Sequence, residues 1–183
     1  MTLSGQNRQV GIFGRGRIGE AIAKRALGFD ATIHYHSRTP KDVNFIYHSA
    51  VKELAAAVDV LFVITPGGAS TYHLVNDEVM NALGAKGMLI NVARGSVVDE
   101  TALIAALQDG RLGSAGLDVF EQEPKIPEAL KTMENVVLLP HVGSASVETR
   151  QAMGDLTCEN LERYMQDSTV VTPVPECAAL NGK

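Results

Sequence analysis

The feature that most constrains this chain is an apolar run followed at once by three spaced glycines and a helical pattern, VGIFGRGRIGEAIAKRA. The first glycine would let the chain turn sharply at the end of a strand. The second would let a phosphate approach the backbone, and the third would let the next helix pack closely. The N–H groups of the first helical turn and the helix dipole would then face an anion. The pattern predicts a dinucleotide pyrophosphate site at Gly14, Arg15, Gly16, Arg17, Ile18 and Gly19; a turn that serves only a tight strand–helix joint is the alternative.

Length and composition exclude several classes of protein. A chain of 183 residues with 45% hydrophobic content suits one globular domain with its own core. Its net charge of −5, without a basic stripe, argues against a nucleic-acid partner. We expect no signal peptide and no membrane span. Two cysteines without metal or disulfide spacing indicate a reducing, cytoplasmic setting.

Short β-branched runs alternate with helical patterns along the whole chain. Because the runs are apolar on both faces, we predict a parallel sheet covered by helices on both sides, a doubly wound, Rossmann-like α/β/α fold. This single domain is expected to span residues 1–183, with an irregular tail over 169–183. The predicted strands are Val10–Phe13, Ala31–Tyr35, Phe45–Ile46, Val60–Ile64, Met88–Asn91, Ser114–Leu117 and Val136–Leu139. The predicted helices are Arg17–Leu27, Val51–Ala57, Asp77–Leu83, Glu100–Gln108 and Val147–Gln166, with Ser49, Asp99 and Ser146 as candidate N-caps.

The turn after the second strand bears on the choice of nicotinamide coenzyme. An NAD enzyme would place a carboxylate there to hold the ribose 2′-hydroxyl. This chain has no acidic residue before Asp42, and it offers instead the hydroxyls and guanidinium of Ser37, Arg38 and Thr39. A guanidinium binds a 2′-phosphate, which a carboxylate would repel. We therefore predict NADP(H) in preference to NAD(H), with NAD(H) possible; a polar turn without selectivity is the alternative.

Three further stretches resemble the D-isomer-specific 2-hydroxyacid dehydrogenases, especially the hydroxypyruvate/glyoxylate and hydroxyphenylpyruvate reductase-like branch. They are NVARGSVVDETAL (Asn91–Leu103), GLDVFEQEP (Gly116–Pro124) and LLPHVGSAS (Leu138–Ser146). The resemblance implies that Arg94 binds the carboxylate of a 2-oxo acid and that His141 protonates the ketone oxygen. Glu123 would orient the imidazole. The predicted coenzyme contacts further comprise Thr65, Pro66, Val92, Ala93, Arg94, Asp118, His141, Gly143 and Ser144.

Each of these residues has a plainer interpretation when taken alone. Arg94 would be a surface arginine paired with Asp99, and His141 a hydrogen-bonded structural histidine. Glu121 and Glu123 would be solvated loop charges; Glu123 is preferred as the imidazole's partner because it holds the family's position before a proline. The remaining histidines form no convincing metal set, so no metal site is predicted. They are His34, His36, His48 and His73.

The family resemblance also implies a part that this chain does not show. Members carry an amino-terminal substrate domain, whereas the first predicted strand here begins at residue 10. We expect that domain to be absent and the chain to form a homodimer, as the family generally does. Three hypotheses stay open: a reductase represented by its coenzyme domain, an NADP(H)-binding module without turnover, or a domain that pairs with a separate substrate domain.

Overall fold

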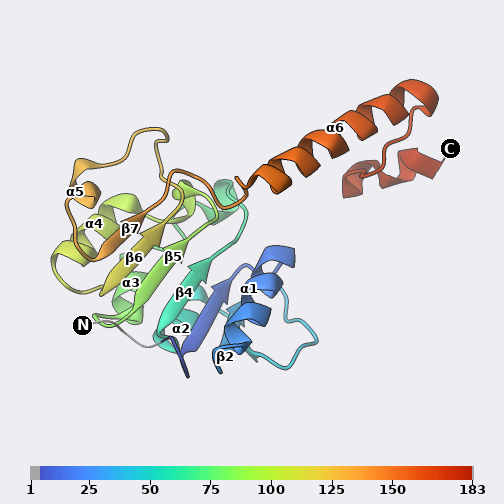
Figure 1. Cartoon of the computed structure of the whole chain (residues 1–183). Coiled ribbons are helices and arrows are strands. Elements are labelled where there is room, and N and C mark those ends of the chain that lie inside the picture. Colours follow the sequence, from blue (N-terminus) through green and yellow to red (C-terminus); the bar gives the residue numbers. More distant parts are fainter. Residues whose placement is uncertain (1–4, 183) are drawn as a thin grey trace. The chain divides into compact units, whose positions relative to one another are not determined.

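The computed structural model describes residues 5–182 (Figure 1). The chain divides into two compact units, Met1–His141 and Val142–Lys183. The first unit holds a sheet and its helices, and the second holds one long helix and the segment that follows it.

The first unit is built on a seven-stranded, all-parallel sheet in the order β3-β2-β1-β4-β5-β6-β7. The order reverses between β1 and β4, which is the switch point where ligands of such sheets bind. The doubly wound fold predicted from the sequence is therefore confirmed, with each strand within one or two residues of its predicted range. The strands are β1 (Gln9–Phe13), β2 (Thr32–His36), β3 (Ile46–Tyr47), β4 (Val60–Val63), β5 (Met88–Asn91), β6 (Ser114–Leu117) and β7 (Val136–Leu138).

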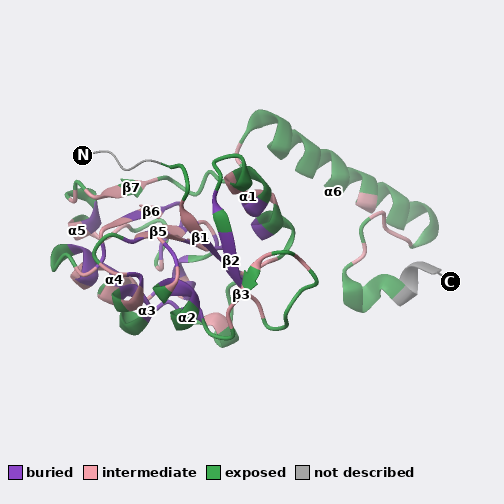
Figure 2. Ribbon diagram, turned by 90° about the horizontal axis from the view of Figure 1, so that it is seen from below, coloured by how far each residue is buried: buried purple, intermediate pink, exposed green. Residues whose placement is uncertain are grey.

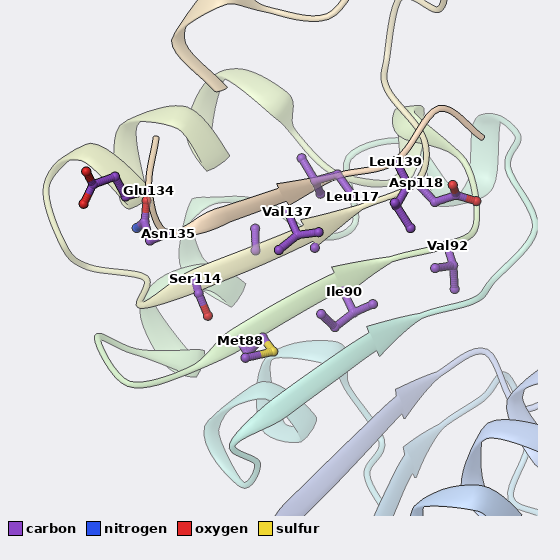
Figure 3. Close-up of a pocket in the computed structure, with 12 residues that line it drawn as sticks. Met88, Ile90, Val92, Ser114, Leu117, Asp118, Glu134, Asn135, Val137 and Leu139 are labelled. Atoms are coloured by element: carbon purple, nitrogen blue, oxygen red, sulfur yellow. The ribbon is translucent and has the colours of Figure 1, made fainter. Parts of the chain in front are cut away.

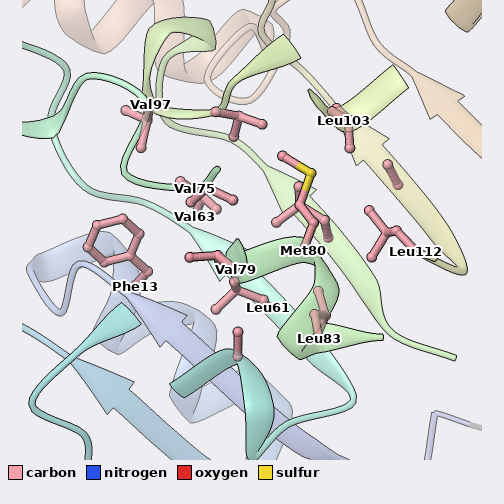
Figure 4. Packing of buried hydrophobic residues seen from close by; sticks show 14 of the residues in the cluster. Phe13, Leu61, Val63, Val75, Val79, Met80, Leu83, Val97, Leu103 and Leu112 are labelled. Atoms are coloured by element: carbon pink, nitrogen blue, oxygen red, sulfur yellow. The ribbon is translucent and has the colours of Figure 1, made fainter. Parts of the chain in front are cut away.

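Two apolar clusters join the helices to opposite faces of the sheet (Figure 2). Ile12 and Ala23 belong to the smaller cluster, which α1 covers, whereas Phe13 points into the larger one under α2, α3 and α4 (Figure 4). This alternation along β1 is the period-two pattern of a strand buried on both faces. The helices are α1 (Arg17–Leu27), α2 (Val51–Ala56), α3 (Asp77–Leu83), α4 (Glu100–Gln108) and a short α5 (Glu128–Lys131), which the sequence pattern did not reveal.

Side-chain caps fix where several helices begin. Asp99 accepts a hydrogen bond from the Ala102 N–H at 3.0 Å, as the sequence predicted. Ser49 does not cap α2: the N-cap residue is Ala50, and the Ser49 hydroxyl donates to Glu53 instead. An unpredicted cap at α3 is Asn76, which accepts from the Val79 N–H. These caps satisfy N–H groups that have no acceptor within the helix.

Apolar side chains line a cavity on one face of the sheet, beside β5, β6 and β7. Met88 and Ile90 of β5 line a cavity of about 490 Å³ together with Val137 and Leu139 (Figure 3). Val137 is 63% exposed and Leu139 47% exposed. Within the first unit, the helices α1 to α4 flank the sheet as predicted, and no helix described in that unit fills this cavity beside β5–β7. The residues that line the cavity are as apolar as buried ones, so the sequence alone could not distinguish this part of the sheet from the buried strands.

The second unit consists mainly of α6 (Val147–Asp167), which Ser146 caps by accepting from the Thr149 N–H. Ser168 ends the helix in the left-handed region at φ +61°. Within the tail, which the sequence predicts to be irregular, the structure has a 3₁₀ helix, η3 (Pro175–Gly182). No helix in residues 5–182 has the length and apolarity needed to cross a bilayer.

Candidate coenzyme and catalytic site

The glycine turn after β1 has a geometry that other residues would disturb at two positions. Gly14 has φ +103°, and a Cβ there would lie 2.6 Å from the Thr65 nitrogen. A Cβ at Gly19 would lie 2.6 Å from the Gly14 oxygen and 3.0 Å from Ile12. Gly16 differs, because a Cβ there would meet no atom within 4 Å. Two glycines therefore serve the strand–helix joint, whereas Gly16 faces open space at the N-terminus of α1.

The turn after β2 carries the predicted 2′-phosphate group of residues. The Ser37 hydroxyl donates to the Thr39 oxygen at 2.6 Å, which closes the turn, and Arg38 is exposed on it. Behind the turn, the Tyr35 hydroxyl and the backbone of Lys41 hydrogen-bond in both directions. The guanidinium of Arg15 lies over the Tyr35 ring, 5.7 Å from its centroid. Hydrogen bonds between Tyr35 and Lys41 thus fix the turn, and the Arg38 side chain is exposed to solvent.

Arg94 stands on a turn that follows β5 and leads into a short 3₁₀ helix, η2 (Gly95–Val97). The buried side chain of Asn91 holds this turn, accepting from the Ala93 N–H and donating to the Arg94 oxygen. The Arg94 guanidinium donates to the Ala93 oxygen at 2.5 Å and is exposed. Asp99 caps α4 rather than pairing with Arg94, so the plainer interpretation of a surface ion pair does not describe this arginine.

His141 and Glu123 form a hydrogen-bonded pair at the centre of the site. The Nδ1–H of His141 donates to Glu123 Oε2 at 2.9 Å, and Glu123 Oε1 accepts from the Phe120 N–H at 3.0 Å. The hydrogen bond from His141 lowers the pKa of the Glu123 carboxyl, with smaller contributions from Phe120 and Arg94. This carboxylate therefore stabilises the fold above its usual pKa, and the contribution is lost as the pH falls through the lowered value. With Nδ1 engaged, Nε2 of His141 remains for other chemistry.

A single cleft of about 880 Å³ brings most of these groups together. Ile18 of the glycine turn lines the same cleft as Arg94, Glu123 and His141. The remaining lining residues come from the ends of β4, β5 and β6 and the turns that follow them: Ile64, Thr65, Pro66, Gly67, Gly68, Val92, Ala93, Gly95, Ser96, Phe120, Glu121 and Gln122. Ile18, in the first turn of α1, and the predicted catalytic groups therefore share one hollow at the carboxyl edge of the sheet.

Not every predicted residue lines this cleft. Asp118 is buried and lines the cavity beside β5–β7 (Figure 3). Val92 lines both this cavity and the cleft. Gly143 and Ser144 belong to the second unit of the chain. The turn at residues 37–39 follows β2, on the other side of β1 from β4.

The sequence left several cleft residues unassigned. Gly95 has no room for a side chain, since a Cβ would lie 1.9 Å from the Phe120 carbonyl carbon. A glycine directly after Arg94 was the signal that could have indicated this close approach. Glu121, the other glutamate considered as a partner for His141, contacts His73 instead at 2.9 Å. No local pattern connects residues that are 48 positions apart.

The remaining histidines have side-chain or backbone partners. His34 Nδ1 lies 2.9 Å from His48 Nε2, and His34 Nε2 lies 2.9 Å from Gln9 Oε1. Burial and the neighbouring His48 lower the pKa of His34. His36 Nδ1 bonds the His48 carbonyl oxygen. Among residues 5–182, no group of three or more histidine, cysteine, aspartate or glutamate side chains is arranged to hold a metal ion.

Comparison with known proteins identifies the family. Residues 1–143 match the D-isomer specific 2-hydroxyacid dehydrogenase, NAD binding domain. The chain is 55% identical over 175 residues to glyoxylate/hydroxypyruvate reductase A HPR2 of Arabidopsis thaliana, covering 95% of this chain and 56% of that protein. It is 52% identical to hydroxyphenylpyruvate reductase of Plectranthus scutellarioides, over 95% of this chain and 56% of the relative.

The fold agrees with this relationship. The crystal structure of an NADPH-dependent glyoxylate/hydroxypyruvate reductase from Sinorhizobium meliloti, in complex with NADP and malonate, superposes with a TM-score of 0.93 at 55% identity. It matches 95% of this chain and 55% of the reductase. The chain thus spans about half the length of the relatives it matches. The chain belongs to the D-isomer specific 2-hydroxyacid dehydrogenases and carries their NAD-binding domain.

Proposed function

We propose that this chain is the coenzyme-binding part of an NADP(H)-preferring oxidoreductase that interconverts a 2-oxo acid and a 2-hydroxy acid. One observation carries the proposal: Ile18, which follows the glycine turn at the start of α1, lines the same cleft as Arg94, Glu123 and His141. A coenzyme bound across the switch point would bring its reactive ring toward a cation and an imidazole. These are the groups that ketone reduction requires.

The residues of the turn fit a dinucleotide. The open space at Gly16 is the kind of opening that a phosphate needs, and the first turn of α1 would supply N–H donors. Thr65 and Pro66, at the end of β4, would border the path from the glycine turn toward Arg94. When bound, the nicotinamide supplies the hydride for reduction or accepts it for oxidation.

The preference for NADP(H) rests on the turn after β2. Its cation, Arg38, is exposed, and the Ser37 and Thr39 hydroxyls flank it. The first acidic residue after β2 is Asp42. The Sinorhizobium meliloti relative is NADPH-dependent and was crystallised with NADP. The exposed cation, the lack of an acidic residue between β2 and Asp42, and the coenzyme of this relative all support recognition of a 2′-phosphate by Arg38.

The chain's own side chains would divide the chemistry among themselves. Arg94 would bind the substrate carboxylate and polarise the neighbouring carbonyl, because its planar guanidinium presents several N–H donors. His141 would donate the Nε2 proton to the carbonyl oxygen during reduction and take it back during oxidation. Glu123, bound to Nδ1, would fix the ring's orientation and direct Nε2 to the substrate.

The relatives point to the chemical class of the substrate. Their names specify glyoxylate, hydroxypyruvate and hydroxyphenylpyruvate, all of which are 2-oxo acids. We propose a small acid of this class, with the assignment of Asp118, Gly143 and Ser144 as coenzyme contacts kept as part of the proposal. A homodimer is proposed as well, supported by the exposed apolar face of β5–β7. The free thiols of Cys158 and Cys177 support the proposed cytoplasmic setting.

Replacement of His141 tests the proposed chemistry. In a form that carries a substrate domain, His141→Ala should lower the rate of glyoxylate or hydroxypyruvate reduction about 10²- to 10⁴-fold, the usual contribution of a general acid. Its affinity for NADPH should change little. The measurement is steady-state NADPH oxidation, followed by absorbance, beside a coenzyme titration. An undiminished rate would assign the proton to another donor and contradict the proposal.

The second candidate is a module that binds NADP(H) and pairs with a separate substrate domain. The chain alone would then bind coenzyme without turnover. Addition of a separately produced substrate domain should restore turnover only under this second candidate.

A further inference from the structure

His73 occupies an unusual position beside the cleft. Its backbone has φ +50°, in the left-handed region that few non-glycine residues adopt. Its ring stacks on the Tyr72 ring, with 3.8 Å between the centroids. The proposed chemistry gives this histidine no role, yet such a conformation persists only where the surroundings hold it.

The backbone of His73 is tied to the turn that carries Arg94. The His73 N–H donates to the Ser96 oxygen at 2.9 Å. Two residues further on, the Val75 N–H donates to the Val97 oxygen, and the Asp99 N–H donates back to the Val75 oxygen. The segment after η1 (Ala69–Thr71) therefore runs alongside η2 like a short additional strand and restrains the Arg94 turn.

The ring of His73 is tied to the loop that carries Glu123. Its Nε2–H donates to Glu121 Oε1 at 2.9 Å, and the Tyr72 hydroxyl donates to the same oxygen at 3.2 Å. Two residues after Glu121, the Glu123 carboxylate accepts from the Phe120 N–H and pairs with His141. An anchor at Glu121 thus fixes the loop from which the Glu123 carboxylate reaches His141.

Three carboxylates lie near the His73 ring. Glu121 lies at 2.9 Å from Nε2, and Asp99 lies at 3.9 Å from Nδ1. Glu100 is a third nearby carboxylate, because its Oε2 accepts from the Glu121 N–H at 3.2 Å. Burial raises the pKa of Glu100, and burial together with Glu121 raises the pKa of Tyr72. The side chains of His73 and Glu121 are each about three-quarters buried, so solvent screens their contact less than it would a surface pair.

We propose that His73 is a positioning residue that holds the Arg94 turn through its backbone and the Glu123 loop through its ring. The two loops also touch directly, since Gly95 packs against the backbone of Phe120 and Glu121. His73 would keep this contact in one arrangement, and with it the spacing between the guanidinium and the Glu123–His141 pair. The inference rests on the proposed function only in treating that pair as catalytic.

The test measures the Glu123 carboxyl in the purified chain by ¹³C NMR titration, without coenzyme or turnover. Loss of the Glu121 charge alone would lower the pKa of Glu123, because a like charge disappears. Release of the loop would instead raise it toward the usual value, because the bonds from His141 and Phe120 loosen. For Glu121→Ala we expect a rise of about 0.5 or more. Glu121→Gln, which keeps an acceptor for His73, should give no rise.

Amide exchange supplies a second readout. Exchange of the Phe120 N–H should quicken about tenfold or more in Glu121→Ala, because its acceptor Glu123 becomes mobile. His73→Asn, which tolerates the left-handed backbone, should have the same effect, and the double variant should add little to either single change. Glu128→Ala, at an exposed glutamate paired with Lys131, is the matched control.

The proposal is overturned if Glu121→Ala leaves the Glu123 pKa unchanged or lowered and leaves Phe120 exchange unaltered. It is also overturned if effects of His73→Asn and Glu121→Ala add independently. Should His73→Asn fail to fold, the comparison of Glu121→Ala with Glu121→Gln decides. A failure of coenzyme binding or turnover would bear on the proposed function and leave this result unaffected.

Discussion

Arg38→Ala should separate the two coenzymes. Only NADPH carries the 2′-phosphate that Arg38 is proposed to bind. A hydrogen bond to a charged group contributes about 1.5–3 kcal/mol, and the exposure of Arg38 places its contribution near the lower end. At 1.4 kcal/mol for each factor of ten, the Kd for NADPH should rise about 10- to 30-fold, whereas that for NADH should change less than about twofold.

The assay is a titration of coenzyme fluorescence for both coenzymes, at low and at high salt. The difference between NADPH and NADH should shrink at high salt, since an exposed charge pair is screened. Arg17→Ala is the matched control: Arg17 opens α1 beside the proposed pyrophosphate, which both coenzymes share, so both should weaken together. Equal losses for NADPH and NADH in Arg38→Ala would refute recognition of the 2′-phosphate by this turn.

The other predictions concern the glycine turn, the buried histidine and the proposed acid. Gly16→Ala should leave the melting temperature unchanged, because the added Cβ meets only open space. The same Cβ should weaken the binding of both coenzymes, because that space is the proposed place of their phosphates. Gly19→Ala should cost about 1–3 kcal/mol of stability through its clash with Gly14, as thermal and urea unfolding would show. Unchanged coenzyme affinity in the first variant, or unchanged stability in the second, would contradict these assignments. Because the pKa of His34 is lowered in the folded chain, the unfolded chain binds a proton there more readily. The free energy of unfolding should therefore be retained above about pH 6.5 and should fall as the pH drops below that value. Urea titrations from pH 5 to 8 should show this fall, and His34→Gln should reduce it; an equal fall in both proteins would assign it elsewhere. In a form that carries a substrate domain, His141→Ala should lower turnover about 10²- to 10⁴-fold and spare coenzyme affinity, as the paired kinetic and binding measurements above would show.

The features predictable from sequence are those encoded locally. At the turn, Gly14 and Gly19 must avoid atoms of Ile64 and Thr65 as well as atoms a few residues away in the chain, and only the latter are encoded locally. The apolar runs gave the strand positions because a parallel strand buried on both faces has a distinctive composition. Asn76 was missed as a cap, although an asparagine before two acidic residues and an apolar position carries the signal.

Contacts between distant segments had no such signal. The bond between His73 and Glu121 joins residues far apart along the chain, and its partners were assigned only as a histidine without a metal and a solvated glutamate. The place of Asp118 depends on which side of β6 its carboxylate leaves, which a strand-end position does not determine. The exposure of Val137 likewise depends on what covers the sheet, and not on the strand itself.

The cleft that Ile18, Arg94, Glu123 and His141 line is proposed to receive a reduced nicotinamide coenzyme. The most direct measurement is a parallel fluorescence titration of the purified, folded chain with NADPH and NADH. Saturable binding of both, tighter for NADPH and weakened for both by Gly16→Ala, is the predicted result. A folded chain that binds neither coenzyme would contradict the account.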